Sequence, residues 1–181
     1  GTYTMDTFCL SKDNITLKPL TYNDIDDRII WNTTITDWKR EENPMEDTAN
    51  AFLFNEEKYR IKKKEEICSG GKTQNGLHTS LEIFVENVHV GFINCHAYPL
   101  ESDILLGANI GIIIPNLVYR NKGYGTQCVE LYSNYLFGKG VRRLYLITFD
   151  SNLGMLSVMR KNGFEVISKK GSKIISYKDC E

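Results

Sequence analysis

Apolar and polar residues alternate in several short segments of this chain, while longer segments repeat apolar residues with the period of a helix. Residues 15–20 alternate and end near a proline, so they predict an opening strand. Apolar residues on one helical face then predict a helix that Thr21 caps and that ends near Trp31. We expect a polar loop over residues 32–45 and a second helix over residues 46–67, with a charged outer face.

The middle of the chain predicts three long strands. A glycine-rich loop over residues 69–76 separates them from the second helix. Residues 77–85 and 88–98 alternate on either side of a short polar turn, which is typical of a hairpin. Residues 104–114 form a third segment of the same kind. Three such consecutive strands predict an antiparallel meander.

The last part of the chain predicts helices between strands. Apolar residues from Cys128 to Leu136 recur at i, i+3, i+4, i+7 and i+8, which predicts a helix that ends at Gly138. We then expect strands over residues 143–149, 164–167 and 174–177, and a helix over residues 150–163. The order β-α-α-β-β-β-α-β-α-β-β predicts an α/β (α+β) fold, with a mixed, mostly antiparallel sheet that helices cover.

The composition is that of a soluble globular protein, with 41% apolar and 25% charged residues among 181. We expect residues 1–181 to form a single domain, with residues 1–4 as a leftover of cloning before Met5. A net charge of −1 argues against nucleic acid and against an anionic membrane as partners. No apolar run reaches the roughly 18 residues of a membrane span, and no secretory signal precedes the first strand. Five scattered cysteines without a Cys-x-x-Cys pair are typical of reduced thiols, so we expect a cytoplasmic protein.

The most informative segment is a basic, glycine-containing turn between the meander and the next helix. Gly123 and Gly125 let the backbone approach a ligand closely. The turn leads into a helix N-terminus, where unpaired N–H groups and the helix dipole favour an anion. Arg120 and Lys122 add positive charge. This combination predicts a phosphate-binding site.

Two other phosphate-binding motifs do not fit the chain. A dinucleotide fingerprint needs a third glycine, and Cys128 stands at that position. The sequence Gly71-Lys72-Thr73 is similar to the end of a P-loop, but Glu66 stands where the first glycine of that motif belongs. The turn therefore indicates a different phosphate ligand.

Three segments together carry a family pattern. Residues 120–125 read Arg-x-x-Gly-x-Gly after an apolar strand, and Asn152 is followed after a helix by Gly-Phe at residues 163–164. Both match motifs of the GNAT superfamily of acetyl-CoA-dependent N-acyltransferases, which the chain resembles from residue 15 to about residue 177. Residues 15–24 are similar to the branch with ribosomal-protein and polyamine acetyltransferases. The resemblance implies a GNAT-like sheet of about six to seven strands flanked by about four helices.

The resemblance also implies acetyl-CoA as the acetyl donor, bound around the turn. Backbone N–H groups of residues 120–126 would bind its pyrophosphate, and backbone groups of residues 112–114 would pair with its pantetheine arm. Asn152 would reach the same arm, and the alternative for this residue is a plain helix cap. The implied cofactor-binding residues are Ile112, Ile113, Ile114, Arg120, Asn121, Lys122, Gly123, Tyr124, Gly125, Thr126 and Asn152.

The proton-transfer residues of the family have no clear match. Asn109 stands where many members carry a Glu base, and it is our catalytic candidate because an amide can orient a water or an amine. Met159 stands where many members carry a Tyr acid, and Met155 where the ribosomal-protein branch can carry a Ser. A thiolate with an ordinary pKa of about 8.5 could take its proton from water instead. Other candidates for the base are Glu82, His96 and Asp103.

The acceptor pocket of the family lies at the first two helices, their loop and the last strands. The residues of that loop that bear on an acceptor are Trp31, Asp37, Trp38, Glu41 and Glu42. Aromatic and acidic groups together suit a cationic amine, and packing is the alternative role of the two tryptophans. The histidines at 78, 89 and 96 have no metal-ligand spacing with the cysteines, so we expect no metal.

These observations predict an N-acetyltransferase that moves acetyl from acetyl-CoA to a primary amine by direct attack in a ternary complex. The acceptor would be a small-molecule amine or a peptide or protein N-terminus. We expect Cys95 and Cys128 to be buried, so that neither is a covalent nucleophile. The alternative is a non-catalytic sensor domain that binds CoA or acetyl-CoA, which the missing acid and base favour. The sequence leaves open the acceptor and the choice between a monomer and a homodimer.

Overall fold

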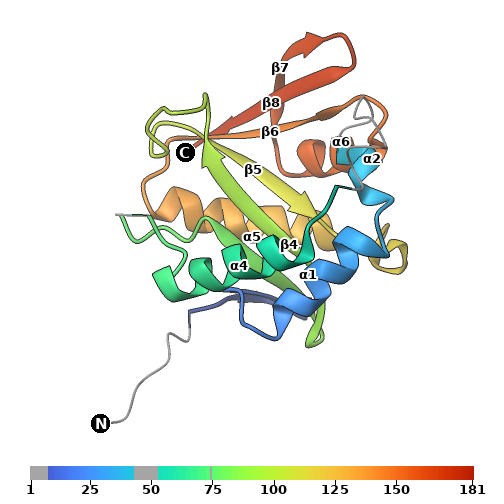
Figure 1. Cartoon of the computed structure of the whole chain (residues 1–181). Coiled ribbons are helices and arrows are strands. Elements are labelled where there is room, and N and C mark those ends of the chain that lie inside the picture. The colour runs from blue at the N-terminus through green and yellow to red at the C-terminus, as the bar shows by residue number, and fades with distance from the viewer. Residues whose placement is uncertain (1–7, 43–52, 74) are drawn as a thin grey trace.

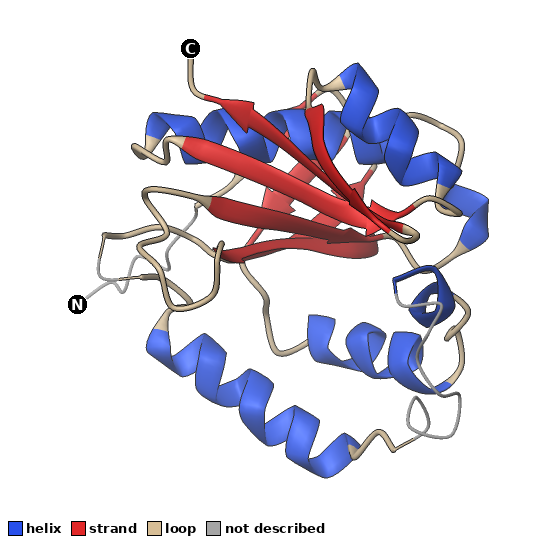
Figure 2. Ribbon diagram, turned by 90° about the horizontal axis from the view of Figure 1, so that it is seen from above, coloured by secondary structure: helices blue, strands red, loops and turns tan. Residues whose placement is uncertain are grey.

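The structure, a computed structural model, describes residues 8–42, 53–73 and 75–181. It shows a sheet of eight strands between two layers of helices (Figure 1, Figure 2). The strands are β1 (Leu10–Lys12), β2 (Ile15–Lys18), β3 (Ser80–Val85), β4 (Val88–Ala97), β5 (Ala108–Ile113), β6 (Arg143–Phe149), β7 (Glu165–Lys170) and β8 (Lys173–Asp179). The helices are α1 (Asp24–Thr33), α2 (Trp38–Glu42), α4 (Glu56–Ser69), α5 (Tyr124–Gly138), α6 (Leu153–Lys161) and the 3₁₀ helix η1 (Leu117–Tyr119).

The described strands pair in the order β1-β2-β3-β4-β5-β6-β8-β7, and β5 and β6 form the parallel pair among them. The other neighbours are antiparallel. The parallel pair is short, with Ala108 opposite Leu144 and Asn109 opposite Tyr145. Both strands continue beyond these positions, and no further pairing between them occurs in the described part of the chain. The two strands therefore diverge and leave one edge of β5 without a neighbouring strand.

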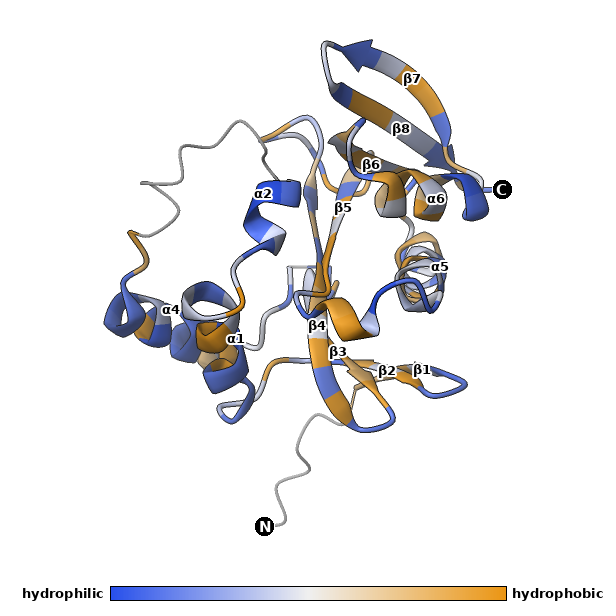
Figure 3. Cartoon of the chain, turned by 90° about the vertical axis from the view of Figure 1, so that its right-hand side faces the viewer, coloured by the Kyte–Doolittle hydropathy of each residue, from blue (hydrophilic) through white to orange (hydrophobic). Residues whose placement is uncertain are grey.

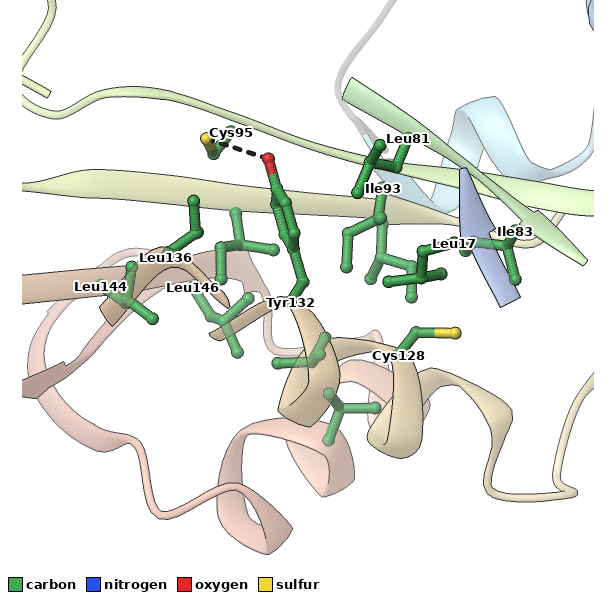
Figure 4. Packing of buried hydrophobic residues seen from close by; sticks show 14 of the residues in the cluster. Leu17, Leu81, Ile83, Ile93, Cys95, Cys128, Tyr132, Leu136, Leu144 and Leu146 are labelled. Atoms are coloured by element: carbon green, nitrogen blue, oxygen red, sulfur yellow. Dashed lines mark hydrogen bonds between the residues drawn. The ribbon is translucent and has the colours of Figure 1, made fainter. Parts of the chain in front are cut away.

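The main hydrophobic core lies between the sheet and α5. Figure 3 shows α5 and α6 on one side of the sheet and α1 and α4 on the other. Strand residues such as Leu17 and Ile93 are fully buried against α5. Tyr132 of α5 lies among them, and its hydroxyl donates to the backbone oxygen of His78 at 2.7 Å and to Sγ of Cys95 at 3.2 Å (Figure 4). Each fully buried aliphatic side chain contributes about 1.5–3 kcal/mol, so this layer fixes the strands that carry the site.

A buried network of charged groups joins α1 to the other face of the sheet. Arg28 donates to both oxygens of Glu82, at 2.6 Å and 2.7 Å. The two ring nitrogens of His89 contact Asp27 at 2.7 Å and Glu82 at 3.1 Å. Burial raises the pKa of Glu82, but hydrogen bonds from His89 and Arg28 outweigh it and hold that pKa below its ordinary value. Burial lowers the pKa of His89, but the hydrogen bond and charge of Glu82 outweigh it and leave that pKa raised.

The predicted mixed, mostly antiparallel fold is confirmed, and the sheet has one strand more than the upper expected number. The additional strand is β1, which pairs with β2 through a turn where Asp13 has φ 53°. Its three residues are too few to show an alternating pattern. The strands expected from residues 77 and 104 begin later, at Ser80 and Ala108. Among the described residues, no helix combines the length and hydrophobicity needed to cross a membrane.

The predicted start of the second helix was wrong. Residues 53–55 are not helical, and α4 begins at Glu56. Asn55 caps it by accepting a hydrogen bond from the backbone N–H of Lys58 at 3.0 Å. The rest of the expected helical segment before residue 53 lies outside the described residues.

The predicted loop between the first two helices contains the short helix α2. Trp38 of α2 donates its indole N–H to the backbone oxygen of Trp31 at 2.7 Å, a tertiary contact that a periodic pattern does not reveal. The cap of α1 also differs, because Asn23 rather than Thr21 is its N-cap. The backbone N–H and the hydroxyl of Thr21 instead donate to the side chain of Asp24, both at 2.9 Å.

Candidate functional site

The turn after β5 leads into a helix N-terminus that no side chain caps. Asn121 and Gly123 have positive φ values of 59° and 81°, and Gly123 is the N-cap of α5. Because glycine has no side-chain oxygen, the first N–H groups of the helix, from Tyr124 to Thr126, are left for water or a ligand. Together with the helix dipole, these groups favour an anion.

Gly123 and Gly125 are constrained in different ways. At Gly123 an added Cβ would have room, with the nearest atom, Nε2 of Gln127, at 3.8 Å, so the positive φ is what favours glycine. At Gly125 the backbone is helical, and an added Cβ would lie 3.4 Å from Cγ2 of Val158 in α6. Gly125 therefore allows α5 and α6 to pack closely beside the turn.

A cavity of about 350 Å³ lies where this turn meets β5, α6 and α2. All the cofactor-binding residues predicted from the sequence line it except Lys122, which is exposed and not among the lining residues. The lining residues that were not predicted as cofactor-binding are Trp38, Glu41, Tyr119, Gly154, Met155, Ser157, Val158 and Lys161. The cavity therefore joins the helix N-terminus to the unpaired edge of β5.

Arg120 does not present a free positive charge to this cavity. Its Nε donates to the backbone oxygen of Ile114 at 3.0 Å, and its Nη1 forms an ion pair with Glu41 of α2. Glu41 therefore neutralises the guanidinium charge. The positive character of the cavity comes from the N–H groups of the turn and from Lys161.

Asn152 caps α6 and also lines the cavity. Its Oδ1 accepts a hydrogen bond from the backbone N–H of Met155 at 3.1 Å. The helix-cap alternative for this residue is thus confirmed. Because the cap uses the carbonyl oxygen, the Nδ2 amide group is the part of the side chain that can donate to a ligand.

The two carboxylates considered as bases are both engaged elsewhere. Glu82 is 0% exposed and is bound by Arg28 and His89. Asp103 is exposed in the turn before β5, where its Oδ1 accepts from the backbone N–H of Leu105 at 2.9 Å. Neither carboxylate lines the cavity.

Asn109 and His96 meet at the position where β5 and β6 diverge. They are partners in the β4–β5 ladder, and Nδ2 of Asn109 lies 3.4 Å from Nε2 of His96. Both lie on the face of the sheet opposite α5, because the neighbours Ala108 and Ile110 are buried in the core. Asn109 Oδ1 is buried and has no hydrogen-bond partner among the described residues. Asn109 is not one of the residues that line the cavity.

Three of the remaining chemical candidates, Met159, Cys95 and Cys128, are buried. Met159, at the position of the family's Tyr acid, is 3% exposed and packs in the core, whereas Met155 lines the cavity. Burial raises the pKa of Cys95 to about 11 and that of Cys128 to about 12, so neither thiol supplies a thiolate near neutral pH.

Asp24, Asp27 and His89 bring three potential metal-ligand atoms within 4.8 Å of one another. The contacts within this group explain the proximity without an ion. His89 bridges Asp27 and Glu82 with its two ring nitrogens, and its raised pKa favours a proton on the imidazole. The group therefore belongs to the network that holds α1.

The family model described as acetyltransferase (GNAT) domain matches residues 14–165 of the chain. The chain therefore belongs to the GNAT acetyltransferase family. Its members are N-acetyltransferases that take the acetyl group from acetyl-CoA. A comparison with curated protein sequences gives no significant match.

Solved structures with this fold include enzymes crystallised with coenzyme A. RimL, a ribosomal alpha-N-protein acetyltransferase in complex with coenzyme A, is 14% identical, with a TM-score of 0.71 over 95% of this chain and 98% of its own. A ribosomal-protein alanine acetyltransferase from Vibrio fischeri is 12% identical, with a TM-score of 0.70 over 96% and 97%. The PaiA N-acetyltransferase from Thermoplasma acidophilum in complex with coenzyme A is 22% identical, with a TM-score of 0.66 over 91% and 98%. At these identities, the similarity shows the shared fold.

Proposed function

We propose that this chain transfers an acetyl group from acetyl-CoA to a primary amine, by direct attack of the amine in a ternary complex. The observation that carries this proposal is the short pairing of β5 with β6 beside an uncapped helix N-terminus. The cavity that connects these two features offers an anion site at one end and an open strand edge at the other.

The N-terminus of α5 suits the pyrophosphate of the donor. The N–H groups of Tyr124, Gly125 and Thr126 are directed outward from the helix end, and backbone donors of this kind favour phosphate oxygens. Lys161 of α6 also lines the cavity and adds a positive charge. A carboxylate added at Gly125 would oppose the same anion.

The open edge of β5 suits the pantetheine arm. This arm contains two amide groups, which can pair with the backbone of residues 112–114 as a neighbouring strand would. An arm about as long as four extended residues spans roughly 14 Å, which reaches from the turn toward the point where β5 and β6 meet. Asn152 lines the same stretch and can donate through Nδ2.

The burial of both thiols of this region supports direct attack. Cys95 and Cys128 are buried thiols with raised pKa values. Within the ternary complex the amine and the thioester are held together, which removes much of the entropic cost of their encounter. Asn109 lies where the strands diverge and can orient the amine or a water through its amide.

The acceptor is a small-molecule amine or the N-terminus of a peptide or protein. Ribosomal-protein acetyltransferases among the structures with this fold make a peptide N-terminus the acceptor to test first. On the acceptor side of the sheet, Trp31 packs against Phe92 and His89 with centroid distances of 6.2 Å and 4.7 Å. Trp31 is 5% exposed and Phe92 is 9% exposed, so packing, the alternative role of this tryptophan, accounts for these contacts.

A non-catalytic sensor that binds CoA or acetyl-CoA is the second candidate. It is favoured by Met159, which stands at the position of the family's acid and is buried in the core. The two candidates share the donor site and differ in turnover.

A thiol-release screen separates them. The protein is incubated with acetyl-CoA and, in turn, spermidine, an aminoglycoside, free amino acids and a short peptide with a free N-terminus. An acetyltransferase releases CoA thiol with at least one amine, and mass spectrometry finds the acetylated product. Binding of acetyl-CoA without thiol release across the panel would instead favour the sensor.

A further inference from the structure

A histidine lies where β5 and β6 diverge, next to the expected position of the thioester. The two strands pair at Ala108 and Asn109 and no further. If the pantetheine arm follows the open edge of β5, as the proposed function requires, its sulfur end arrives beside Asn109. The residue opposite Asn109 on the neighbouring strand β4 is His96.

The side chains at this point differ in their access to solvent. Ala108 and Ile110 of β5 are 0% and 3% exposed, and they face the core under α5. Asn109 therefore faces the opposite side of the sheet, and His96 lies beside it with an exposed side chain. Tyr145 stands opposite Asn109 on β6, and its ring centroid is 4.6 Å from that of Tyr98. An imidazole and two phenols thus surround the place where the strands separate.

Asn109 offers His96 a positioning contact. Its Nδ2 lies 3.4 Å from Nε2 of His96, and its Oδ1 is buried without a hydrogen-bond partner among the described residues. A buried amide oxygen without a partner is unfavourable in protein interiors. Rotating the amide by 180° would turn this oxygen toward a ring N–H of His96, since the two orientations are alternatives for the same side chain. With the oxygen toward the ring, Nε2 carries the proton and donates to Asn109, so that Nδ1 keeps its lone pair for a substrate proton.

The two carboxylates considered for the base are excluded by their contacts. Glu82 is enclosed by Arg28 and His89. Asp103 accepts a hydrogen bond from the backbone N–H of Leu105, within the loop that precedes β5. Of the candidates for the base named from the sequence, His96 is the one whose exposed titratable group adjoins the end of the β5–β6 pairing.

We infer that His96 is the general base of the acetyl transfer and that Asn109 is the positioning residue that orients its ring. This inference rests on the proposed function. The acceptor ammonium first gives a proton to solvent water and becomes a free amine. The amine nitrogen then forms a bond to the thioester carbonyl carbon while His96 takes a second proton from that nitrogen. The carbon–sulfur bond breaks, and the proton on His96 passes to the departing sulfur, so that an amide and CoA thiol are formed.

The test compares His96→Gln and His96→Ala with the wild type, using the amine of the screening panel that gives the highest rate. A general base contributes about 10²–10⁴-fold, so we expect kcat to fall at least 100-fold in His96→Gln, while the Kd for acetyl-CoA stays within about two-fold. The control Val88→Gln adds the same side chain to an exposed position at the other end of β4 and is expected to leave kcat unchanged.

Two further readouts separate a base from a structural role. Added imidazole should raise the kcat of His96→Ala at least ten-fold, because the exposed site lets a free base enter. The pH profile of kcat should lose in His96→Gln the limb that the base produces in the wild type. A kcat within three-fold of wild type in His96→Gln, or no rescue of His96→Ala, would overturn the inference while wild-type turnover keeps the proposed function. Wild-type protein that binds acetyl-CoA but acetylates no amine of the panel would overturn both.

Discussion

Replacing Glu82 by glutamine tests how strongly the buried network holds α1 against the sheet. Glu82 is fully buried, and Arg28, with a side chain that is 6% exposed, donates to both of its oxygens at 2.6 Å and 2.7 Å. Glu82→Gln removes the charge that balances Arg28 and His89, and removing one partner of a buried pair costs about 3–5 kcal/mol. This loss is a large share of the total stability, since the free energy of unfolding of such a domain is about 5–15 kcal/mol.

Urea denaturation followed by circular dichroism measures this loss. With a slope of about 2 kcal/mol per molar urea, the midpoint should fall by about 1.5–2.5 M. Asp179→Asn is a matched control, because Arg143 also binds Asp179 in a bidentate way, with hydrogen bonds of 2.6 Å and 3.0 Å. The side chains of this pair are 40% and 51% exposed. The control should lose no more than about 1 kcal/mol. Equal losses in the two variants, or a loss below 1 kcal/mol for Glu82→Gln, would refute the reasoning from burial.

Three further predictions follow from the same structure. The pKa of His89 is raised on folding, so its contribution to stability is complete below about pH 6.5 and is lost as the pH rises through the raised value. The urea midpoint of unfolding should therefore decline over this pH range in the wild type and not in His89→Gln. Parallel declines in the two proteins would contradict the assignment of this stability to His89. Glu41→Gln frees Arg120 for the donor phosphate and should tighten acetyl-CoA binding by about 2- to 5-fold in calorimetry, whereas weaker binding would argue that Glu41 helps to form the site. Aromatic disulfide reagents should label three thiols of the native protein and reach Cys95 and Cys128 only after unfolding, so five rapid reactions would contradict their burial.

Sequence patterns predicted the turn, the helix after it and the cap beside the cavity because these are local backbone features. The positive φ of Gly123, the helix that follows it and the cap at Asn152 each depend on a few neighbouring residues. Glycine at a left-handed position and asparagine before a helix are preferences of the local chain, so their spacing is visible in the sequence. All the residues predicted to bind the cofactor except Lys122 line the cavity, and their role in binding stays a prediction.

Features that depend on distant contacts were not visible in the sequence. Arg120 was expected to face a phosphate, but its partner Glu41 lies 79 residues away on a helix that the sequence did not predict. That helix is held by the indole of Trp38 rather than by an apolar repeat. The pairing of His96 with Asn109 follows from the register of β4 and β5, and the start of β5 was predicted too early. Register requires knowledge of the turn between the strands, which residue patterns define only loosely.

Calorimetric titration with acetyl-CoA most directly tests the claim that the cavity beside α5 is the donor site. The wild type should bind at micromolar strength, and Gly125→Glu should abolish binding by placing a carboxylate beside the pyrophosphate. At a separation of about 5 Å from two negative charges, the repulsion is about 1.7 kcal/mol in water and about 7 kcal/mol at an effective dielectric of 20, which corresponds to at least a 15-fold loss. Gly138→Glu adds the same charge in open space at the other end of α5 and should bind as the wild type does. No binding by the wild type, or equal binding by Gly125→Glu and Gly138→Glu, would contradict the proposed donor site.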